Sequence, residues 1–439
     1  MRTFSALLFV MFALSANAAD GTVGTVSVQK GNNVSVNGEA PLSLTLDGKD
    51  HQNCQFLSKR APDESHEFTW KEVTTTRGGE LAEILGDQLR SVDSLVVKGN
   101  VNDKDFHAMW DASLYGYLSV INLKNAVLEN NAVPDTAFFH ENEQYEGSSH
   151  EIFYYIGLRK IILPEGLEKI GEGAFYQASA LRQVNFPSTL RYIGDFAFNA
   201  TKLEMNQLVI PEGVEEINQY AFAFCRKLKA QVTLPSTIKK IGEWAFYGCP
   251  ITSINLPEGL ESLGSLAFWD CDLREVSIPS SCHEFNEGWQ FGFNRNLEKM
   301  HLPEGMTEIP DHFAVDCFRL REVNFPHTLK HIGEKAFSLC ISLKNVELPL
   351  GMQSLGEEAF SELEALEQIV FPASMKSLGK NSCSYWKNIK RIYCAAMEPP
   401  VCDPTDGGVF SGFDFPDGLN TPVVYVPKGS INKYKDTSR

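Results

Sequence analysis

The sequence predicts a solenoid, in which one short structural unit is stacked many times along an axis. Ten prolines lie 22 to 24 residues apart, and the segments around them are near copies of one another. Examples are LPSTIKKIGEWAF from Leu234 and FPHTLKHIGEKAF from Phe325. Self-similarity at a fixed short period is the signature of a repeat architecture. The prolines are Pro164, Pro187, Pro211, Pro235, Pro257, Pro279, Pro303, Pro326, Pro349 and Pro372.

Each unit is expected to contain a short strand that ends at its proline. Apolar residues stand three and one positions before the proline, as Val232 and Leu234 do before Pro235, with a variable residue between them. A spacing of two is typical of a half-buried strand, and proline ends the strand because it has no N–H for the ladder. Such a strand cannot bury its inner face alone, so it must stack on identical neighbours.

An Ala-Phe pair stands ten and eleven residues after the proline in seven of the ten units, as at Ala245 and Phe246. We expect this Phe to fill the core. A period near 23 lies within the range of leucine-rich repeats. The sequence therefore predicts a leucine-rich-repeat solenoid, a strand-dominated repeat α/β fold. It should form a right-handed curved stack of about 12 coils of 22–24 residues, with a concave parallel sheet and terminal caps.

Both ends of the predicted stack depart from the consensus, as expected where one face of a terminal coil meets water. The strand-like segments 94–99 and 119–124 are interpreted as degenerate units, and a polar insertion at 140–150 follows them. The solenoid is predicted over 71–395 and the C-terminal cap over 396–439, with a strand in PVVYVP and a short helix in KGSINKYKD. Residues 19–70 have no predicted fold.

The first 18 residues have the pattern of a signal peptide. A basic Arg2 precedes an apolar run, and the small residues Ala16 and Ala18 stand at the −3 and −1 positions of a cleavage point. We therefore expect export to the outer cell surface or the extracellular space, with no later transmembrane segment. The net charge of −17, from 39 basic and 56 acidic side chains, disfavours nucleic acid and anionic membranes as partners.

Five of the ten cysteines share one slot, 14 residues after their proline, and that slot is apolar in other units. We expect buried thiols there, because stacked side chains that point the same way fit the disulfide torsion poorly. In the cap, Cys402 is the best candidate for a bridge, with Cys394 or Cys383 as its partner. The five cysteines are Cys225, Cys249, Cys271, Cys317 and Cys340.

Metal and catalytic patterns are weak throughout the chain. His327 and His331 have a four-residue spacing but fall in a turn, and Asp403–Gly408 lacks the spaced acidic ligands of a calcium loop. No strand-linked GxSxG, HExxH or phosphate-binding loop is present in the sequence. We expect no metal, no cofactor and no catalytic residue, and hence a protein that is not an enzyme.

The repeat, as in IKKIGEWAFYGC from Ile238 to Cys249, resembles the BspA-like class of leucine-rich repeats found in bacterial surface proteins, notably of the Bacteroides group. The resemblance covers roughly residues 90 to 395. The tail IYCAAMEPP followed by VVYVPKGSINKYK is similar to the C-terminal cap of that class. The resemblance implies a secreted or surface protein that mediates protein–protein binding, including adhesion to host matrix or plasma proteins. It supplies no ligand motif.

The candidate partner-binding surface is the outer face of the predicted strands, because the residue two before each proline points away from the core. The alternative for these residues is a solvated sheet face. A second candidate is the set of aromatic residues after the repeat Phe, whose alternative role is to cover the core. The candidates on the strands are Arg159, Lys160, Ile162, Arg182, Asn185, Val209, Thr233 and Asn255, and those in the aromatic set are Tyr247 and Trp269.

Two functions are consistent with this pattern. The first is a non-enzymatic, monomeric binding protein whose partner is a protein or glycan macromolecule. The second is the repeat scaffold of a secreted enzyme or of a glycan-binding complex. The lack of a second compact domain in the sequence favours the first, since solenoid faces commonly serve as extended binding surfaces.

Overall fold

The computed structural model describes residues 67–139, 156–402, 408–410 and 422–435, together with four strands near the N-terminus. The predicted signal peptide, the insertion at 140–150 and the loop at 403–407 lie outside the described residues. The four strands form one sheet in the order β2-β1-β3-β4, within the segment that has no predicted fold. They are β1 (Gly24–Gln29), β2 (Asn33–Gly38), β3 (Leu44–Leu46) and β4 (Lys49–His51).

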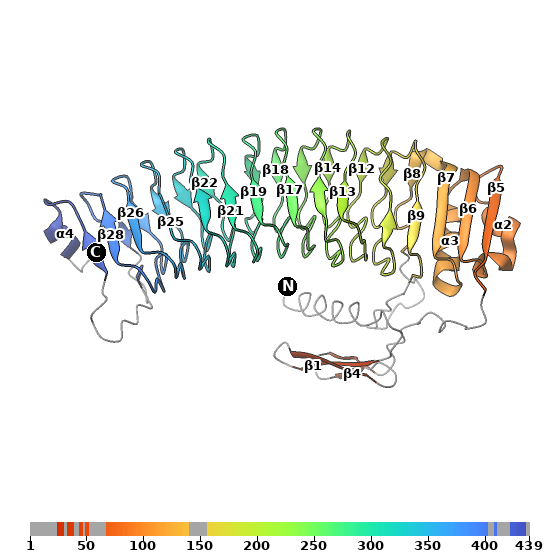
Figure 1. The fold of residues 1–439 in the computed structure, drawn as a ribbon, viewed down its shortest axis with the longest axis horizontal. Helices are drawn as coiled ribbons and strands as arrows, with labels where there is room; N and C mark the ends of the chain where they lie inside the picture. The colour runs from red at the N-terminus through yellow and green to blue at the C-terminus, as the bar shows by residue number, and fades with distance from the viewer. Residues whose placement is uncertain are drawn as a thin grey trace. The chain divides into compact units, whose positions relative to one another are not determined.

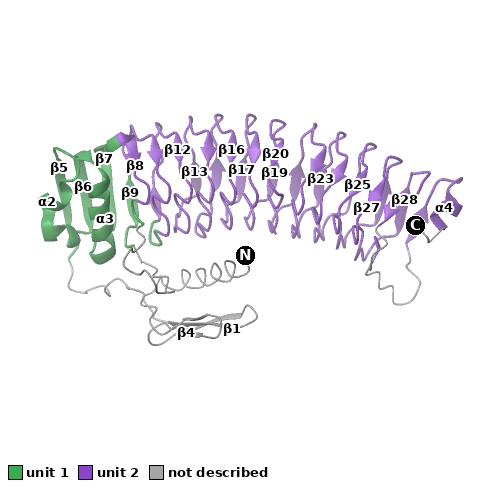
Figure 2. Cartoon of the chain, turned by 180° about the vertical axis from the view of Figure 1, so that it is seen from behind, with its two compact units in different colours: residues 1–129, 137–162, 178–181 green, residues 130–136, 163–177, 182–439 purple. Residues whose placement is uncertain are grey.

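The chain divides into two compact units, coloured separately in Figure 2. The first comprises residues 1–129, 137–162 and 178–181, and the second comprises 130–136, 163–177 and 182–439. The fold as a whole is a parallel-strand β-solenoid of about 13 turns with little helix, so the predicted solenoid class is confirmed.

The first unit contains a parallel sheet in the order β9-β7-β6-β5, with helices in the connections (Figure 1). The two degenerate strands predicted near residues 94 and 119 are β6 and β7. Its elements are β5 (Trp70–Thr75), α2 (Leu81–Leu85), η1 (Gly86–Arg90), β6 (Ser94–Val101), α3 (Asp103–Tyr115), β7 (Val120–Leu128) and β9 (Lys160–Ile162). The short helix η2 (Glu129–Asn131) directly follows β7.

Helix α3 is not part of the repeat pattern, although its sequence contains a helix signal. The Asn102 side chain accepts a hydrogen bond from the Lys104 N–H at 3.1 Å, and the Asp105 carboxylate accepts one from the Asn102 N–H at 3.0 Å. This reciprocal capping box satisfies backbone donors at the start of the helix. Phe106 and Trp110, four residues apart, are buried on one face.

The second unit repeats three walls around one core, and the first wall consists of the strands that end before the prolines (Figure 1). Except for the first of them, β11, these strands pair in parallel within three sheets, β13-β15-β17, β19-β21-β23 and β26-β28-β30. The strands of the first wall are β11 (Gln183–Val184), β13 (Gln207–Val209), β15 (Gln231–Thr233), β17 (Ser253–Asn255), β19 (Glu275–Ser277), β21 (Lys299–His301), β23 (Glu322–Asn324), β26 (Gln368–Phe371), β28 (Arg391–Cys394) and β30 (Val423–Tyr425). Helix α4 (Ile431–Lys435) follows β30.

The second wall consists of two-residue strands and was not anticipated by the one-strand interpretation of the repeat. These strands form two parallel sheets, in the orders β20-β18-β16-β14-β12-β10-β8 and β22-β24-β25-β27-β29. They are β8 (Ala132–Val133), β10 (Lys169–Ile170), β12 (Tyr192–Ile193), β14 (Glu216–Ile217), β16 (Lys240–Ile241), β18 (Ser262–Leu263), β20 (Glu284–Phe285), β22 (Glu308–Ile309), β24 (His331–Ile332), β25 (Ser354–Leu355), β27 (Ser377–Leu378) and β29 (Val401–Cys402). The glycine after this strand permits close stacking, since a Cβ on Gly242 would lie 2.7 Å from the Gln219 backbone nitrogen.

The third wall consists of the Ala-Phe turns, which also form a hydrogen-bonded ladder. The Phe222 N–H donates to the Ala245 carbonyl at 2.8 Å, and the Phe246 N–H donates to the Ala267 carbonyl at 2.9 Å. The repeat phenylalanines are fully buried, and successive rings lie 5.2 to 5.7 Å apart and nearly parallel. Their predicted role as core filler is confirmed. The stacked rings are Phe175, Phe198, Phe222, Phe246, Phe268 and Phe291.

All nine described cysteines are free thiols, and eight of them are buried. The prediction of buried thiols in the shared slot is thus confirmed, whereas the bridge suggested for Cys402 is wrong: Cys402, Cys394 and Cys383 are all free. The slot also has a polar role, because the Cys249 thiol donates to the Phe222 carbonyl at 2.9 Å. In another coil Trp386 satisfies the Phe360 carbonyl in the same way, through its indole N–H at 2.6 Å. In these coils the slot therefore supplies a buried donor as well as apolar bulk.

Candidate binding surface

The outer face of the first wall presents three of the predicted residues side by side. Val209, Thr233 and Asn255 lie in register on β13, β15 and β17, and all three are exposed. Val209 is an exposed apolar side chain, with 48% of its surface accessible. The inward residues Leu208 and Val232 are buried, as the period of two requires.

A second exposed column lies beside the first, two residues earlier on the same three strands. Gln207, Gln231 and Ser253 are paired in register along it. Both columns are uncharged, and together they offer hydrogen-bond donors and acceptors on three adjacent coils. The arrangement suits a partner that lies across several strands.

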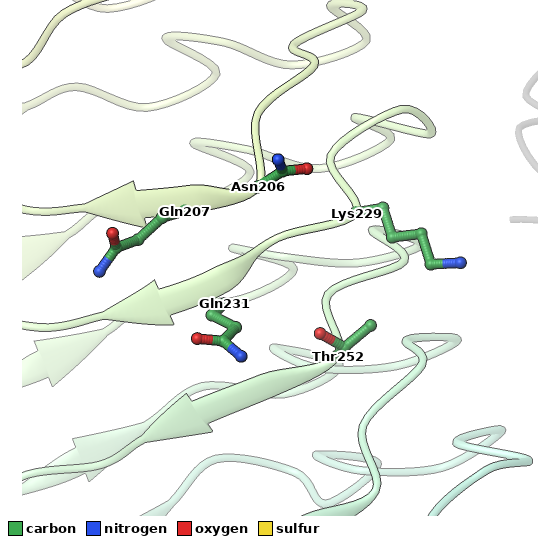
Figure 3. A pocket seen from close by; sticks show the side chains of 5 residues that line it. All are labelled: Asn206, Gln207, Lys229, Gln231 and Thr252. Atoms are coloured by element: carbon green, nitrogen blue, oxygen red, sulfur yellow. The ribbon is translucent and has the colours of Figure 1, made fainter.

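An open hollow of about 500 Å³ lies at the upstream ends of these strands (Figure 3). Asn206, Lys229 and Thr252 line it from the segments that enter the strands, and Gln207 and Gln231 line it from β13 and β15. All five side chains are polar, and four of them can both donate and accept hydrogen bonds. The repeat pattern does not predict this hollow, because it depends on the segments in which coil length varies.

Three of the predicted residues belong to the first unit. Arg159 is exposed, whereas Lys160 and Ile162 are half-buried on β9. In this unit β9 pairs with β7, with Lys160 opposite Val120. Lys160 and Ile162 therefore lie on one strand of the first unit, and Arg159 directly precedes that strand.

Arg182 and Asn185 are engaged within the second unit. Arg182 forms an ion pair with Glu204 at 3.3 Å. The Asn185 amide accepts a hydrogen bond from the Leu163 N–H at 2.7 Å and donates one to the Leu163 carbonyl at 3.0 Å. These two hydrogen bonds, called the asparagine bracket below, link two coils through the Asn185 side chain. The repeat pattern does not predict this role for Asn185.

The aromatic set forms a band along the third wall. Tyr247 packs on Trp244 at 4.4 Å between ring centroids, and Trp269, which is 9% exposed, packs on Phe293 at 4.5 Å. Tyr220 stacks on Trp244 at 5.2 Å and 13°. Because these rings cover one another, the band offers a partner mainly ring edges.

Two rings of this band occupy a strained backbone position. Tyr220 and Trp244 have φ values of 55° and 58°, in the left-handed region that bulky side chains rarely adopt. Stacking between the rings offsets part of this conformational cost. The band therefore has a structural role in the third wall.

The described residues contain no group of three or more His, Cys, Asp or Glu side chains that could hold a metal ion. His327 lies beside Glu304 at 3.0 Å, and the His331 Nδ1 lies 2.7 Å from the Ser354 hydroxyl. Burial raises the pKa of the Cys282 thiol to about 12, which keeps it protonated and a poor nucleophile. In the part of the chain that the structure describes, no helix has the length and apolar character of a membrane span.

Solved structures of bacterial leucine-rich repeat proteins are similar to the chain. A leucine-rich repeat protein from Bacteroides ovatus is 19% identical, with 85% of this chain and 93% of that chain covered and a TM-score of 0.51. A leucine rich cell surface protein from Faecalibacterium prausnitzii is 21% identical, with coverage of 64% and 83% and a TM-score of 0.34. The pneumococcal vaccine antigen PcpA is 17% identical, with coverage of 93% and 95% and a TM-score of 0.35. Because the identity to the Bacteroides ovatus protein is 19%, this similarity shows a shared fold and nothing more.

The repeats also match a protein-family model. The model of the BspA type leucine rich repeat region matches residues 148–232, 229–330 and 309–397, in six copies. These stretches run together from residue 148 to 397 of the 439 residues, which is more than half of the chain. No curated protein matches the chain. The chain belongs to the BspA-type leucine-rich repeat family.

Proposed function

We propose that the protein is a non-enzymatic binding protein that acts outside the cell and holds a protein partner against the outer face of β13, β15 and β17. The observation that carries the proposal is the pair of registered, exposed columns on these strands. One column is Val209, Thr233 and Asn255, and the other is Gln207, Gln231 and Ser253. Strands that pair in parallel hold such columns in fixed register, and preorganisation of this kind limits the entropic cost of association.

The character of this face favours binding to an extended surface. Single contacts at exposed positions contribute little to affinity, so a useful affinity must come from several adjacent coils. Solenoids supply such multi-coil surfaces as a general property of their geometry. The burial of the thiols and the absence of a metal group among the described residues give no support for catalysis.

The proposed location and role in adhesion rest on the sequence. The signal-peptide pattern of residues 1–18 supports export to the cell surface or the medium. The BspA-type repeat supports a role in surface binding, with a host matrix or plasma protein as the proposed partner. We propose that the chain acts as a monomer.

A biosensor experiment tests this function. The mature protein is immobilised and exposed to purified extracellular matrix and plasma proteins, and the tightest binder is measured again with the variant Val209→Arg/Thr233→Arg/Asn255→Arg. We expect at least about a tenfold loss of affinity, because three long charged side chains would block the face. The matched control, Tyr192→Arg/Ser354→Arg/Ser377→Arg, adds the same charge on the second wall and should bind as the wild type does.

Both variants must keep the wild-type circular dichroism spectrum and melting temperature. An unchanged affinity of the folded first-wall variant would contradict the proposed face. Binding to none of the proteins, or chemical change of a bound protein, would contradict the proposed function itself.

A further inference from the structure

A cluster of lysines without counter-charges lies where the third wall turns into the first. Among the described residues, Lys202, Lys227 and Lys229 form no ion pair, whereas the neighbouring Arg182 is neutralised by Glu204. Lys227 and Lys229 belong to one short loop, in which the Lys229 N–H donates to the Lys227 carbonyl at 2.8 Å. In a chain with a net charge of −17, this corner is a local concentration of positive charge.

The cations of this corner are close enough to repel one another. Lys202 is half-buried, and burial lowers its pKa; the positive charges of Arg182 and Lys227 lower that pKa further. Like charges held together cost free energy that an anionic ligand would offset. Lys227 and Lys229 are exposed, so an anion can approach the cluster from solvent.

The polar hollow adjoins the lysine cluster, and Lys229 belongs to both. Its other lining residues are Asn206, Gln207, Gln231 and Thr252. Amide and hydroxyl groups pair well with sugar hydroxyls, which also donate and accept hydrogen bonds. All the lining residues are polar, so the hollow lacks the apolar or aromatic anchors typical of protein–protein hot spots. This difference favours a sugar over a peptide as the occupant.

We infer that this corner binds an acidic glycan, with carboxylate or sulfate groups at Lys202, Lys227 and Lys229 and sugar hydroxyls in the hollow. This inference goes beyond the proposed function, because it assigns a second class of ligand to the lysine cluster and the hollow. Gln207 and Gln231 belong to both sites, whereas the three lysines belong only to the glycan site, and Val209, Thr233 and Asn255 only to the protein site. The lysine variant and the first-wall variant therefore test the two sites separately.

The test is calorimetric titration of the mature protein with four probes of similar length. These are a sulfated heparin fragment, oligogalacturonate, neutral maltodextrin and poly-glutamate. We expect the sulfated fragment, oligogalacturonate or both to bind, and maltodextrin not to bind. Whichever acidic glycan binds identifies the preferred anion. Raising the salt concentration from 0.05 to 0.5 M should weaken binding, because it screens exposed ion pairs.

Three variants separate the contributions of charge and of the hollow. Lys202→Gln/Lys227→Gln/Lys229→Gln should lower the affinity for the bound glycan by about tenfold or more, since each exposed ion pair contributes a factor of about 1.5 to 5. The control Lys330→Gln/Lys344→Gln/Lys376→Gln removes the same charge from exposed lysines elsewhere and should have little effect. Gln207→Ala/Gln231→Ala should weaken glycan binding and leave any binding of poly-glutamate unchanged.

Three results would overturn the inference. The first is the absence of binding to both acidic glycans, and the second is glycan binding that the first lysine variant does not weaken. The third is lysine-dependent binding of poly-glutamate that is tighter than that of either glycan, which would identify an acidic polypeptide as the ligand.

Discussion

Truncation of one core ring, Phe246→Ala, should destabilise the second unit strongly. Phe246 is fully buried, and its ring stacks on Phe222 at 5.3 Å and on Phe268 at 5.5 Å. Truncation of a buried Phe costs about 3–5 kcal/mol of unfolding free energy. We expect a value near the upper end, because two stacked pairs are lost together. The backbone ladder, including the 2.9 Å bond from the Phe246 N–H to Ala267, also limits collapse of the neighbours into the cavity.

Urea denaturation followed by circular dichroism measures this change, with Lys240→Ala as the control. Lys240 is exposed on β16, so its truncation should change the unfolding free energy by less than about 0.5 kcal/mol. Because a stack of repeats is stabilised by nearest-neighbour contacts, amide hydrogen exchange should accelerate most in the coils of Phe222 and Phe268. A loss below about 1 kcal/mol, or equal effects of the two variants, would refute the assignment of the core.

The buried thiols and the asparagine bracket give three further predictions. Burial raises the pKa of Cys282 from 9.0 to about 12. At pH 8 this thiol should therefore resist alkylation in the native protein and react only after denaturation, which mass spectrometry measures. Alkylation of Cys282 in the native protein would contradict this. The unfolded Cys282 thiol ionises near pH 9, while the folded one stays protonated. The unfolding free energy should therefore be constant below pH 9 and decrease as the pH rises from 9 towards 12. Urea midpoints that do not change over this pH range would exclude the effect. Asn185→Ala should lower the unfolding free energy by about 1 kcal/mol in urea denaturation, because the Leu163 backbone loses both bonds of the bracket. Asn255→Ala, at the same slot of another coil, should have less than half that effect, and equal losses would exclude the bracket as the cause.

The first wall and the core could be predicted from the sequence because their signal is repeated. The proline and the apolar residues before it recur in ten units, which specifies both the strand and its inward side. The second wall was missed because two residues, such as Lys240 and Ile241, are too short to show a period. Helix α3 was missed because its capping box at Asn102 and its apolar spacing occur once, outside the repeat.

The candidate surface was predictable only where it follows the strand period. The column of Val209, Thr233 and Asn255 comes directly from alternation along the strands. The hollow and the lysine cluster depend on the segments between the third and first walls, which absorb the differences in coil length. Where Lys229 lies in such a segment cannot be deduced from the repeat. The bracket at Asn185 requires the position of a neighbouring backbone, which the sequence does not contain.

The most direct test of the central claim is hydrogen–deuterium exchange of the protein in complex with its tightest protein binder. We expect slower exchange in peptides that contain β13, β15 and β17, and no change in those that contain β12, β14 and β16 of the second wall. The intact masses of both proteins should stay constant over hours, as a binding protein without turnover requires. Protection confined to the second wall, or a chemically altered partner, would contradict the claim that this chain binds through the outer face of its first wall.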